Sequence, residues 1–305
     1  MGRFILRRLS HGLAVLLAVA TLTFVLMHIT PGGPFDREQR LPPQVMANLH
    51  AKYHLDQPLW SQYLLYVKGL VQGDLGPSYK YLHRTVTDII ASTLPVSGLL
   101  GILALGFAIV VSLPIGLLAA YYHNSWADRW CLFLATLGIS LPNFLLGALL
   151  IWFFSLQIGW FQAGRWGSPA SMVLPTITLG AAPAAYLSYL LRSTLIETLG
   201  EDYIRTARAK GLTETVVLFK HAMRNSINPI LTVMGPLLAA LVTGSFIVEY
   251  VFAIPGMGRF FITAVTDRDY PMIMGVTLVY SALLVGANLA VDMLYSVTDP
   301  RVKTQ

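Results

Sequence analysis

Six long apolar runs alternate with polar segments along the 305-residue chain. A helix that crosses a bilayer needs about 20 predominantly apolar residues, and each run reaches that length. The pattern therefore predicts an all-α, polytopic membrane protein with six transmembrane helices, placed at Leu9–Ile29, Val96–Tyr122, Trp130–Leu156, Met172–Leu191, Ile227–Phe252 and Met272–Val297.

A long polar segment separates the first two apolar runs. A Pro-Pro start followed by apolar residues at helical spacing predicts a helix over residues 41–53, and a Tyr/Leu-rich face predicts another over 60–70. Gly73–Pro77 then predicts a turn. We expect this segment to pack on the outer membrane surface, although its aromatic residues could equally form part of a docking platform.

These patterns divide the chain into two parts. Residues 1–90 form one transmembrane helix followed by a long periplasmic segment. Residues 91–305 form a core of five transmembrane helices, interrupted by a polar loop over residues 197–226. Such a loop is longer than a simple connection between two helices requires.

Composition and charge agree with a membrane protein. The chain is 55% hydrophobic and 12% charged, whereas soluble domains carry about a quarter charged residues. The net charge of +6 does not indicate nucleic-acid binding, because the basic residues cluster beside predicted helices. By the positive-inside rule, both termini and the central loop are predicted to be cytoplasmic. The basic residues that carry this prediction are Arg3, Arg7, Arg8, Arg129, Arg192, Arg205, Arg208, Lys210, Lys220, Arg224, Arg301 and Lys303.

Cysteine and histidine usage excludes two kinds of site. The single cysteine, Cys131, lies in the third predicted helix, so no intramolecular disulfide can form. The seven histidines show no metal-ligand spacing, so no metal site is predicted. Membrane lipids are the expected surroundings of the chain.

Prolines are predicted to break several transmembrane helices. Broken helices are tolerated where they line a cavity or pack against other protein. Pro142 and Asn143 could kink the third helix toward a pathway, or the kink could serve packing alone. The prolines concerned are Pro114, Pro142, Pro175, Pro183, Pro229 and Pro236.

The central loop reads as two short helices that meet at Gly211. Acidic residues precede basic ones in the first helix, which suits the helix dipole. Gly211 stands where a helix commonly ends, and Thr213 is a plausible N-cap for the next helix.

Two interpretations of this bent element remain open. Ile204, Ala207 and Leu212 would supply an apolar surface, small Ala207 and Gly211 would let a partner approach closely, and the basic residues would add complementary charge. A soluble partner could then dock there. Alternatively, the element is an amphipathic hairpin on anionic lipid headgroups.

The loop also carries a family resemblance. Asp202–Leu212, reading DYIRTARAKGL, followed by Lys220–Asn225, reading KHAMRN, resembles the coupling loop of bacterial ABC importer permeases of the dipeptide/oligopeptide/nickel branch. The broader class has Glu-Ala-Ala, three residues and Gly, where this chain has Arg205-Thr-Ala207. It also has His221–Arg224 where the class has Ile-x-Leu-Pro. The peptide branch itself shows similar departures from the motif of the broader class.

Segments along the whole chain share this resemblance, most of all to the B subunits of oligopeptide permeases. The matching segments are Phe4–Arg8, Pro31–Phe35, Leu41–Asn48, Lys52–Leu55, Gly73–Ser78, Ile247–Gly258, Asp267–Tyr270 and Asp299–Pro300.

The resemblance implies a type I ABC importer permease fold and an ATP-driven oligopeptide importer in the bacterial inner membrane. The chain would pair with a homologous second permease, two cytoplasmic ATPases and an extracytoplasmic peptide-binding protein. No Gly-x-x-x-x-Gly-Lys-Ser/Thr motif occurs, so ATP and Mg are expected on the partner subunits, and no cofactor on this chain. The residues expected to couple to the ATPases are Arg205, Thr206, Ala207, Arg208, Lys210, Gly211, Leu212 and Thr213.

Further residues are assigned with an alternative beside each. Glu249, Pro255, Gly256 and Gly258 would form an external gate or turn, with a plain turn into an interfacial helix as the alternative. Charges at membrane depth are often functional. Asp292 is therefore a pathway candidate, as are Pro142 and Asn143 at the predicted kink of the third helix. The acidic Asp292 and Glu249 could instead be paired or capped locally.

Other functions are weighed against the oligopeptide importer. An importer of the same build could carry dipeptides, nickel chelates or another small solute. An independent channel or an intramembrane enzyme is disfavoured, because the sequence shows no paired acidic residues at mid-membrane, no His-Glu-x-x-His and no Ser/His pair.

Overall fold

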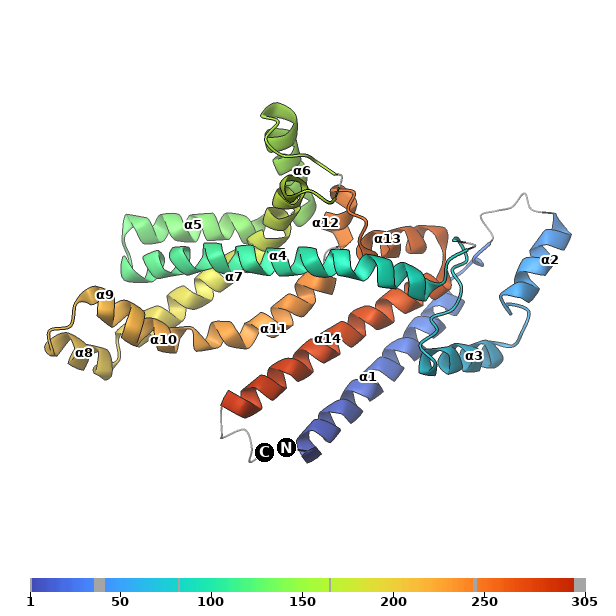
Figure 1. The fold of residues 1–305 in the computed structure, drawn as a ribbon, viewed down its shortest axis with the longest axis horizontal. Coiled ribbons are helices and arrows are strands. Elements are labelled where there is room, and N and C mark those ends of the chain that lie inside the picture. The colour runs from blue at the N-terminus through green and yellow to red at the C-terminus, as the bar shows by residue number, and fades with distance from the viewer. Residues whose placement is uncertain (1, 36–41, 82, 165, 244–245, 299–305) are drawn as a thin grey trace. The chain divides into compact units, whose positions relative to one another are not determined.

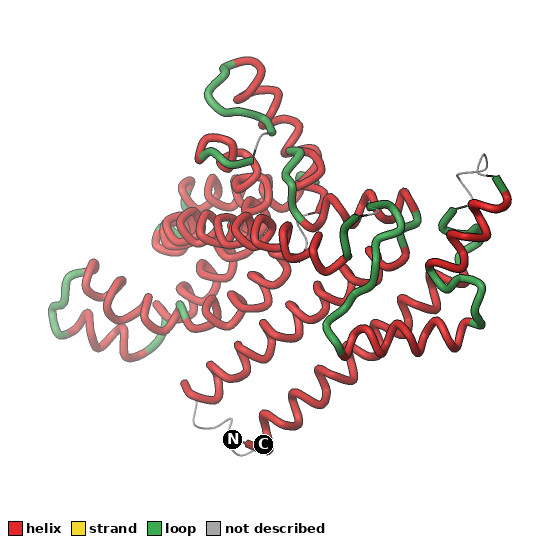
Figure 2. Tube along the Cα trace, turned by 45° about the vertical axis from the view of Figure 1, so that its right-hand side comes forward, coloured by secondary structure: helices red, strands yellow, loops and turns green. Residues whose placement is uncertain are grey.

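Helices joined by loops make up the described part of the chain, where no strand occurs (Figure 2). The structure, a computed structural model, describes residues 2–35, 42–81, 83–164, 166–243 and 246–298. The helices that carry the argument are α1 (Gly2–Ile29), α2 (Pro43–Lys52), α3 (Leu59–Val71), α4 (Val86–Tyr121), α5 (Trp126–Ser140), α6 (Asn143–Leu150), the π-helical η1 (Ile151–Gln157), α7 (Pro169–Leu199), α8 (Asp202–Ala209), α9 (Glu214–Val216), the π-helical η2 (Val217–Ala222), α10 (Met223–Ser226), α11 (Asn228–Thr243), α12 (Phe246–Val251), α13 (Met257–Asp267) and α14 (Tyr270–Thr298).

Five helical segments of the described residues are long and apolar enough to cross a membrane, and a bent pair makes up to six. The bent pair is α5 with α6–η1, which meet at an angle of 105°. The predicted number of transmembrane helices is therefore confirmed when this pair counts as one span, and the third span is sharply broken. The five segments are Leu6–Ile29, Val86–Tyr121, Pro169–Leu199, Asn228–Val251 and Tyr270–Ala290.

Of the prolines expected to break helices, Pro142 lies at the sharp break between α5 and α6. Leu141 before it is extended, with φ −84° and ψ 122°, as the residue preceding a proline prefers to be. Pro175 and Pro183 instead lie inside continuous α7, and Pro236 lies inside α11. The prediction is also wrong for Pro114, which lies inside α4. Pro229 is the second residue of α11 and directly follows the interruption at Ile227 between α10 and α11.

The segment between α1 and α4 contains the two expected short helices. α2 and α3 coincide closely with the predicted ranges 41–53 and 60–70. The expected turn follows, with Gly73 at φ +76° and Gly76 at φ +85°. Glycine adopts this left-handed conformation without the steric cost that a side chain would add.

The chain separates into two compact units. The first unit comprises residues 1–96 and 255–289, and the second comprises 97–254 and 290–305. The first boundary lies close to residue 90, where the sequence suggested a division. Residues 255–289, which lie within the predicted five-helix core, are grouped with the N-terminal segment.

Each unit has its own apolar core. In the first unit, α4 begins with Val86 and Ile89, which are fully buried with Met257 and Met272 of α13 and α14. The second unit is built around α7, where Leu187 and Leu191 pack with buried residues of α4 and α11. A Cβ atom at Gly180 of α7 would lie only 2.7 Å from the carbonyl oxygen of Ala104. Glycine at this position therefore lets α7 approach α4 closely.

Candidate functional site

The polar central loop forms a compact helical hairpin in the second unit. It consists of α8, α9, η2 and α10, and we call residues 202–226 the hairpin. α7 leads into it and α11 leads out of it, and Figure 1 shows α8, α9 and α10 grouped at the ends of these two long helices. In α8, Asp202 lies in the first turn and Arg208 in the last, an order that favours the helix.

The tip of the hairpin turns at Gly211. The backbone there is left-handed, with φ +77°, and the Gly211 amide donates to the Arg208 carbonyl at 2.9 Å. Thr213 takes the N-cap position of α9, as expected, but its side chain makes no capping hydrogen bond. The two helices thus meet at the predicted glycine.

The inner face of α8 is buried within this chain. Ile204 and Ala207 are 0% and 5% exposed, and they pack in one cluster with Leu195 of α7 and with Val217 and Ala222 of η2. We expected Ile204 and Ala207 to offer an apolar surface to a partner. That expectation is wrong for both residues, because their side chains hold the hairpin to α7.

The outer face of the hairpin is exposed, and Leu212 at its tip is 38% exposed. This face combines an apolar tip with polar and basic side chains. Of the residues predicted to couple, those on the outer face are Arg205, Thr206, Arg208, Lys210, Gly211, Leu212 and Thr213.

Ion pairs use part of the charge of this face. Arg208 donates from Nε to Glu214 Oε1 at 2.8 Å, which joins α8 to α9 across the tip. The hydrogen bond that Arg208 donates to Glu214 raises the pKa of the Arg208 guanidinium above its usual range. Arg205 lies 3.4 Å from Asp202 one turn earlier. Lys210 has no ion-pair partner among the described residues, so its charge is available to a partner.

Hydrogen bonds fix the second limb of the hairpin to the first limb and to α7. Asn225 Nδ2 donates to the Tyr203 hydroxyl at 2.8 Å. The Ser226 hydroxyl donates to Thr198 Oγ1 at 2.9 Å, and the Thr194 hydroxyl donates to the Ser226 carbonyl at 3.1 Å. These bonds hold the second limb against the first limb and against the end of α7.

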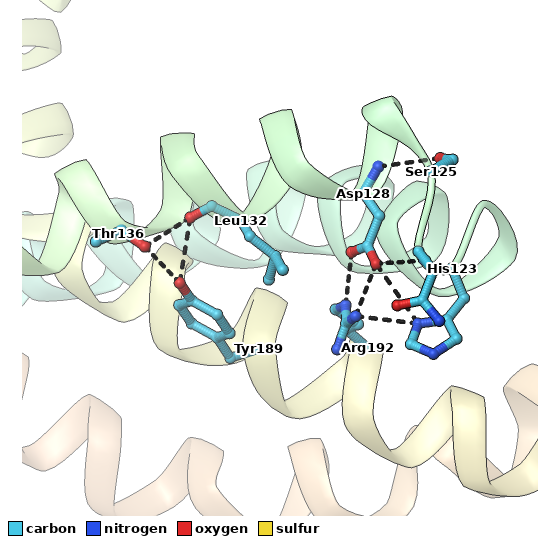
Figure 3. A network of polar contacts seen from close by, with 8 residues as sticks. His123, Ser125, Asp128, Leu132, Thr136, Tyr189 and Arg192 are labelled. Atoms are coloured by element: carbon cyan, nitrogen blue, oxygen red, sulfur yellow. Dashed lines mark hydrogen bonds and ion pairs between the residues drawn. The ribbon is translucent and has the colours of Figure 1, made fainter.

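A buried ion pair joins α5 to the same helix (Figure 3). Asp128 is 2% exposed, and its two carboxylate oxygens each accept a hydrogen bond from Arg192 at 2.7 Å, one from Nε and one from Nη2. The Asn124 amide also donates to Asp128 at 2.9 Å, and His123 Nδ1 lies 3.1 Å from Arg192 Nη2. Such a bidentate pair fixes both distance and orientation.

A second polar contact lies further along α5 and α7. The Tyr189 hydroxyl lies 2.6 Å from Thr136 Oγ1 and donates to the Leu132 carbonyl at 3.1 Å (Figure 3). We did not predict the contribution of Asp128, and Arg192 was considered only as a marker of orientation. Asp128 follows Ser125 at the spacing of a capping motif, which indicates a helix start. No local signal indicates its partner 64 residues away.

The remaining candidates lie on other elements. Pro142 and Asn143 begin α6, which packs on α12. Glu249 is fully buried in α12, and its carbonyl accepts from the Ile254 amide at 2.8 Å. The Asp292 side chain lies outside the described residues. Among the side chains described, no three of His, Cys, Asp or Glu are grouped as metal ligands.

The turn before α13 differs in detail from the expectation. Gly256 precedes α13 with φ −95°, and Gly258 is buried inside that helix. Neither glycine has a positive φ, whereas Ala253 has φ +51°. The unusual backbone conformation of this turn therefore falls on an alanine two residues before Pro255.

Two family models match the chain. Residues 112–304 match the binding-protein-dependent transport system inner membrane component, and residues 1–97 match the N-terminal part of the same kind of membrane component. Together they cover nearly the whole chain.

Curated relatives match over their full length. The dipeptide transport system permease protein DppB of Bacillus subtilis (strain 168) is 45% identical over 303 residues, which is 99% of this chain and 98% of that protein. The oligopeptide transport system permease protein OppB is 40% identical in Haemophilus influenzae and 38% identical in Escherichia coli (strain K12). Each of these two matches covers 99% of this chain and 100% of the relative.

Solved structures share the fold of part of the chain. The MetNI methionine ABC transporter, in an inward-facing form, matches with a TM-score of 0.57 and 20% identity over 69% of this chain and 96% of that one. An amino acid ABC transporter with histidines matches with a TM-score of 0.52 and 20% identity over 70% of this chain and 94% of that one. At this identity the likeness concerns the fold alone.

These matches agree with the all-α architecture and the apolar helices described above. The chain is a multi-pass transport subunit of the inner membrane and not an enzyme, because ATPase activity in these importers belongs to separate subunits. The chain belongs to the binding-protein-dependent transport system inner membrane components, as an ABC importer permease of the dipeptide/oligopeptide family.

Proposed function

We propose that this chain is the permease subunit of an oligopeptide importer and forms half of its translocation pathway beside a homologous second permease. The similarity to OppB proteins over the full length supports this proposal. The 45% identity to a DppB protein supports dipeptides as an alternative cargo. Nickel chelates and other small solutes remain further alternatives.

The hairpin is the proposed contact with a cytoplasmic ATPase. The observation that carries this proposal is its two-sided construction, with Ile204 and Ala207 buried against the chain's own core and Lys210 and Leu212 exposed at the tip. A partner can therefore push on the outer face without first disrupting the hairpin. Since α7 and α11 continue directly from its two ends, a displacement of the hairpin would tilt both helices.

The wider assembly follows from the same proposal. Two cytoplasmic ATPases would bind ATP and Mg, and an extracytoplasmic peptide-binding protein would deliver the cargo. Nucleotide binding would shift the population between inward-open and outward-open states. We assign Glu249, Pro255, Gly256 and Gly258 to an external gate or turn, and we assign the pathway to Pro142, Asn143 and Asp292.

Leu212→Asp tests the contact with the ATPase. The substitution places a charge on the exposed tip and leaves the buried face intact, so the chain should fold and assemble. We expect peptide-dependent ATPase activity of the complete importer in proteoliposomes to fall at least about tenfold, the effect of losing about 1.4 kcal/mol of coupling. Val71→Asp, at an 84% exposed position of α3, is the matched control and should retain full activity.

Two outcomes would contradict the proposed contact. Unchanged peptide-dependent ATPase activity in Leu212→Asp would show that the tip does not couple. Retained ATPase coupling in Leu212→Asp, together with loss of a dependence of the activity on anionic lipid that the wild type shows in the proteoliposomes, would instead place the hairpin on lipid headgroups.

Uptake measurements decide between the proposed cargo and its alternative. The complete importer, supplied with its own binding protein, should accumulate labelled tripeptides, tetrapeptides and pentapeptides. Uptake restricted to dipeptides would favour the dipeptide alternative. Uptake of nickel chelates without any peptide would exclude both.

A further inference from the structure

A cavity of about 290 Å³ lies within the first unit, among α1, the turn after α2, α3, the loop before α4 and the start of α14. Ligand pockets in proteins usually measure about 300–1,000 Å³, so this cavity has room for one amino-acid residue or a small amine. Its residues come from distant parts of the chain, and none belongs to the hairpin.

Aromatic rings form much of the cavity wall. Phe24 and Tyr66 stack with ring centroids 6.0 Å apart, and Tyr53 and Tyr79 lie 4.7 Å apart. Faces of aromatic rings carry negative potential, and they attract cations that come within about 6 Å of the ring centre. Lys52 Nζ already lies 5.3 Å from the centre of the Tyr53 ring, but Lys52 does not line the cavity.

The Tyr66 hydroxyl is the second feature of the wall. It is buried and has no hydrogen-bond partner among the described residues. Burial is the main cause that raises the pKa of Tyr66 to about 12, and the nearby Tyr63 adds a smaller contribution, so the hydroxyl keeps its proton. A buried polar group without a partner is costly, and such groups commonly await a water molecule or a ligand.

One carboxylate completes the wall. Asp74 Oδ1 accepts from the Gly76 amide at 2.9 Å, and Asp74 has no ion-pair partner among the described residues. The lining includes no lysine or arginine. His28 is already held, because its ring nitrogens lie 2.8 Å from the Phe24 carbonyl and 3.3 Å from Gln62 Oε1.

From these groups we propose that the cavity binds the free amino terminus of a short peptide. The Asp74 carboxylate accepts hydrogen bonds from the ammonium group, and the aromatic rings face its positive charge. The Tyr66 hydroxyl donates to the first peptide carbonyl. This inference rests on the proposed function in peptide transport. It adds a peptide-recognition site to a subunit that is proposed to form half of the translocation pathway.

The other common source of a primary ammonium group in a membrane is the headgroup of phosphatidylethanolamine. That headgroup carries a phosphate close to its ammonium group. A wall without lysine or arginine offers the phosphate no permanent positive charge, and burying an anion without a charged partner is unfavourable. The peptide amino terminus therefore fits the cavity better than the lipid does.

The test uses the full-length chain in nanodiscs of phosphatidylglycerol. Binding of trialanine, N-acetyl-trialanine and trialanine amide is measured by saturation-transfer NMR. We expect trialanine and its amide to bind, and acetylation of the amino terminus to abolish binding. Equal binding of the acetylated peptide would overturn the proposal.

Two variants connect binding to the cavity. Asp74→Asn keeps an oxygen for the Gly76 amide but removes the charge, and it should weaken trialanine binding at least about tenfold because charge-assisted hydrogen bonds are the stronger kind. Tyr66→Phe removes only the unpartnered hydroxyl, and it should weaken binding without lowering thermal stability. Asp56→Asn, an exposed acid between α2 and α3 that does not line the cavity, is the matched control.

The outcomes separate this inference from the proposed function. Unchanged trialanine binding in Asp74→Asn would overturn the site, even if the complete importer still took up peptides. Stabilisation of the wild type by phosphatidylethanolamine that is lost in Asp74→Asn, without trialanine binding, would assign the cavity to lipid and overturn the peptide proposal. A failure of peptide uptake by the complete importer would instead contradict the proposed function.

Discussion

Gly211 holds the tip of the hairpin in a conformation that other residues adopt only at a cost. No atom lies within 4 Å of the position that a Cβ would occupy there. The cost of a side chain is therefore confined to the backbone, at about 1–2 kcal/mol for an L-residue in the left-handed region. A substitution of Gly211 therefore changes the backbone strain at the tip without changing its packing.

Gly211→Ala should loosen the hairpin without altering the rest of the chain. A loss of about 1 kcal/mol corresponds to a roughly fivefold more populated local opening. Hydrogen–deuterium exchange of the amides in residues 202–216 should therefore speed up by that factor. Gly106→Ala in α4, where a Cβ also has free space, should leave exchange unchanged or slow it locally, since alanine favours a helix. Equal protection of the hairpin in both variants would contradict the interpretation.

The Asp128–Arg192 pair is the most buried ionic contact described. Removing one partner of a buried pair costs about 3–5 kcal/mol, because the other charge stays without compensation. The Arg192 side chain is 20% exposed, so the loss should be smaller, at about 2 kcal/mol.

Asp128→Asn should accordingly lower the apparent melting temperature of the purified chain by several degrees. Arg205→Gln is the matched control, since that pair with Asp202 has side chains that are 73% and 97% exposed, and exposed pairs contribute little. Equal melting temperatures for the wild type and Asp128→Asn would show that the buried pair contributes nothing to stability.

Among the helices, the effect of a proline depends on its position. The chain breaks between α5 and α6 at Pro142, whereas α7 and α11 continue through the prolines inside them. In α11, Pro236 leaves the Thr232 carbonyl without its usual amide donor, yet the helix continues. At Pro142 the chain turns by 105°. Both prolines are exposed, so neither substitution would open a cavity in the core.

Pro236→Ala should stabilise the chain and Pro142→Ala should not. The first restores a helical hydrogen bond and removes a residue that is unfavourable inside helices, for a gain of about 1 kcal/mol after the entropy of the unfolded chain is counted. The second removes the residue that sets the extended conformation of Leu141. Thermal unfolding of the two purified variants in detergent measures this, and a fall in melting temperature for Pro236→Ala would contradict the argument.

For the chain as a unit, the orientation in the membrane decides which compartment the hairpin faces. The basic residues beside the apolar helices predict that both termini and the hairpin face the cytoplasm, whereas α2 and α3 face outward. This orientation underlies the proposed ATPase contact and the proposed peptide pocket alike.

Single-cysteine labelling measures the orientation directly. Cys131 is replaced by serine, and a cysteine is introduced either at Thr215 on the hairpin or at Asp56 between α2 and α3, two exposed positions. In intact cells a membrane-impermeant maleimide should label the Asp56→Cys variant, and it should label the Thr215→Cys variant only after permeabilisation. The reverse pattern would invert the topology and exclude a cytoplasmic ATPase at the hairpin.

Local patterns were enough to predict the helices that cross the membrane, the short helices α2 and α3, and the turn of the hairpin at Gly211. Each depends on hydrophobicity over a window of residues or on the backbone preference of one residue. The segments shared with peptide permeases also pointed to the family, which the full-length relatives confirm.

Packing between distant segments decided the rest. Ile204 and Ala207 face inward, where they pack with Leu195, Val217 and Ala222. Their spacing along the sequence does not specify which residues they pack with. Asp128 pairs with Arg192 across 64 residues, and the residues around the cavity beside Tyr66 come from distant parts of the chain, from Phe24 to Met274. Hydrophobic periodicity specifies which residues avoid water, but the partner that shields each one depends on how the helices assemble.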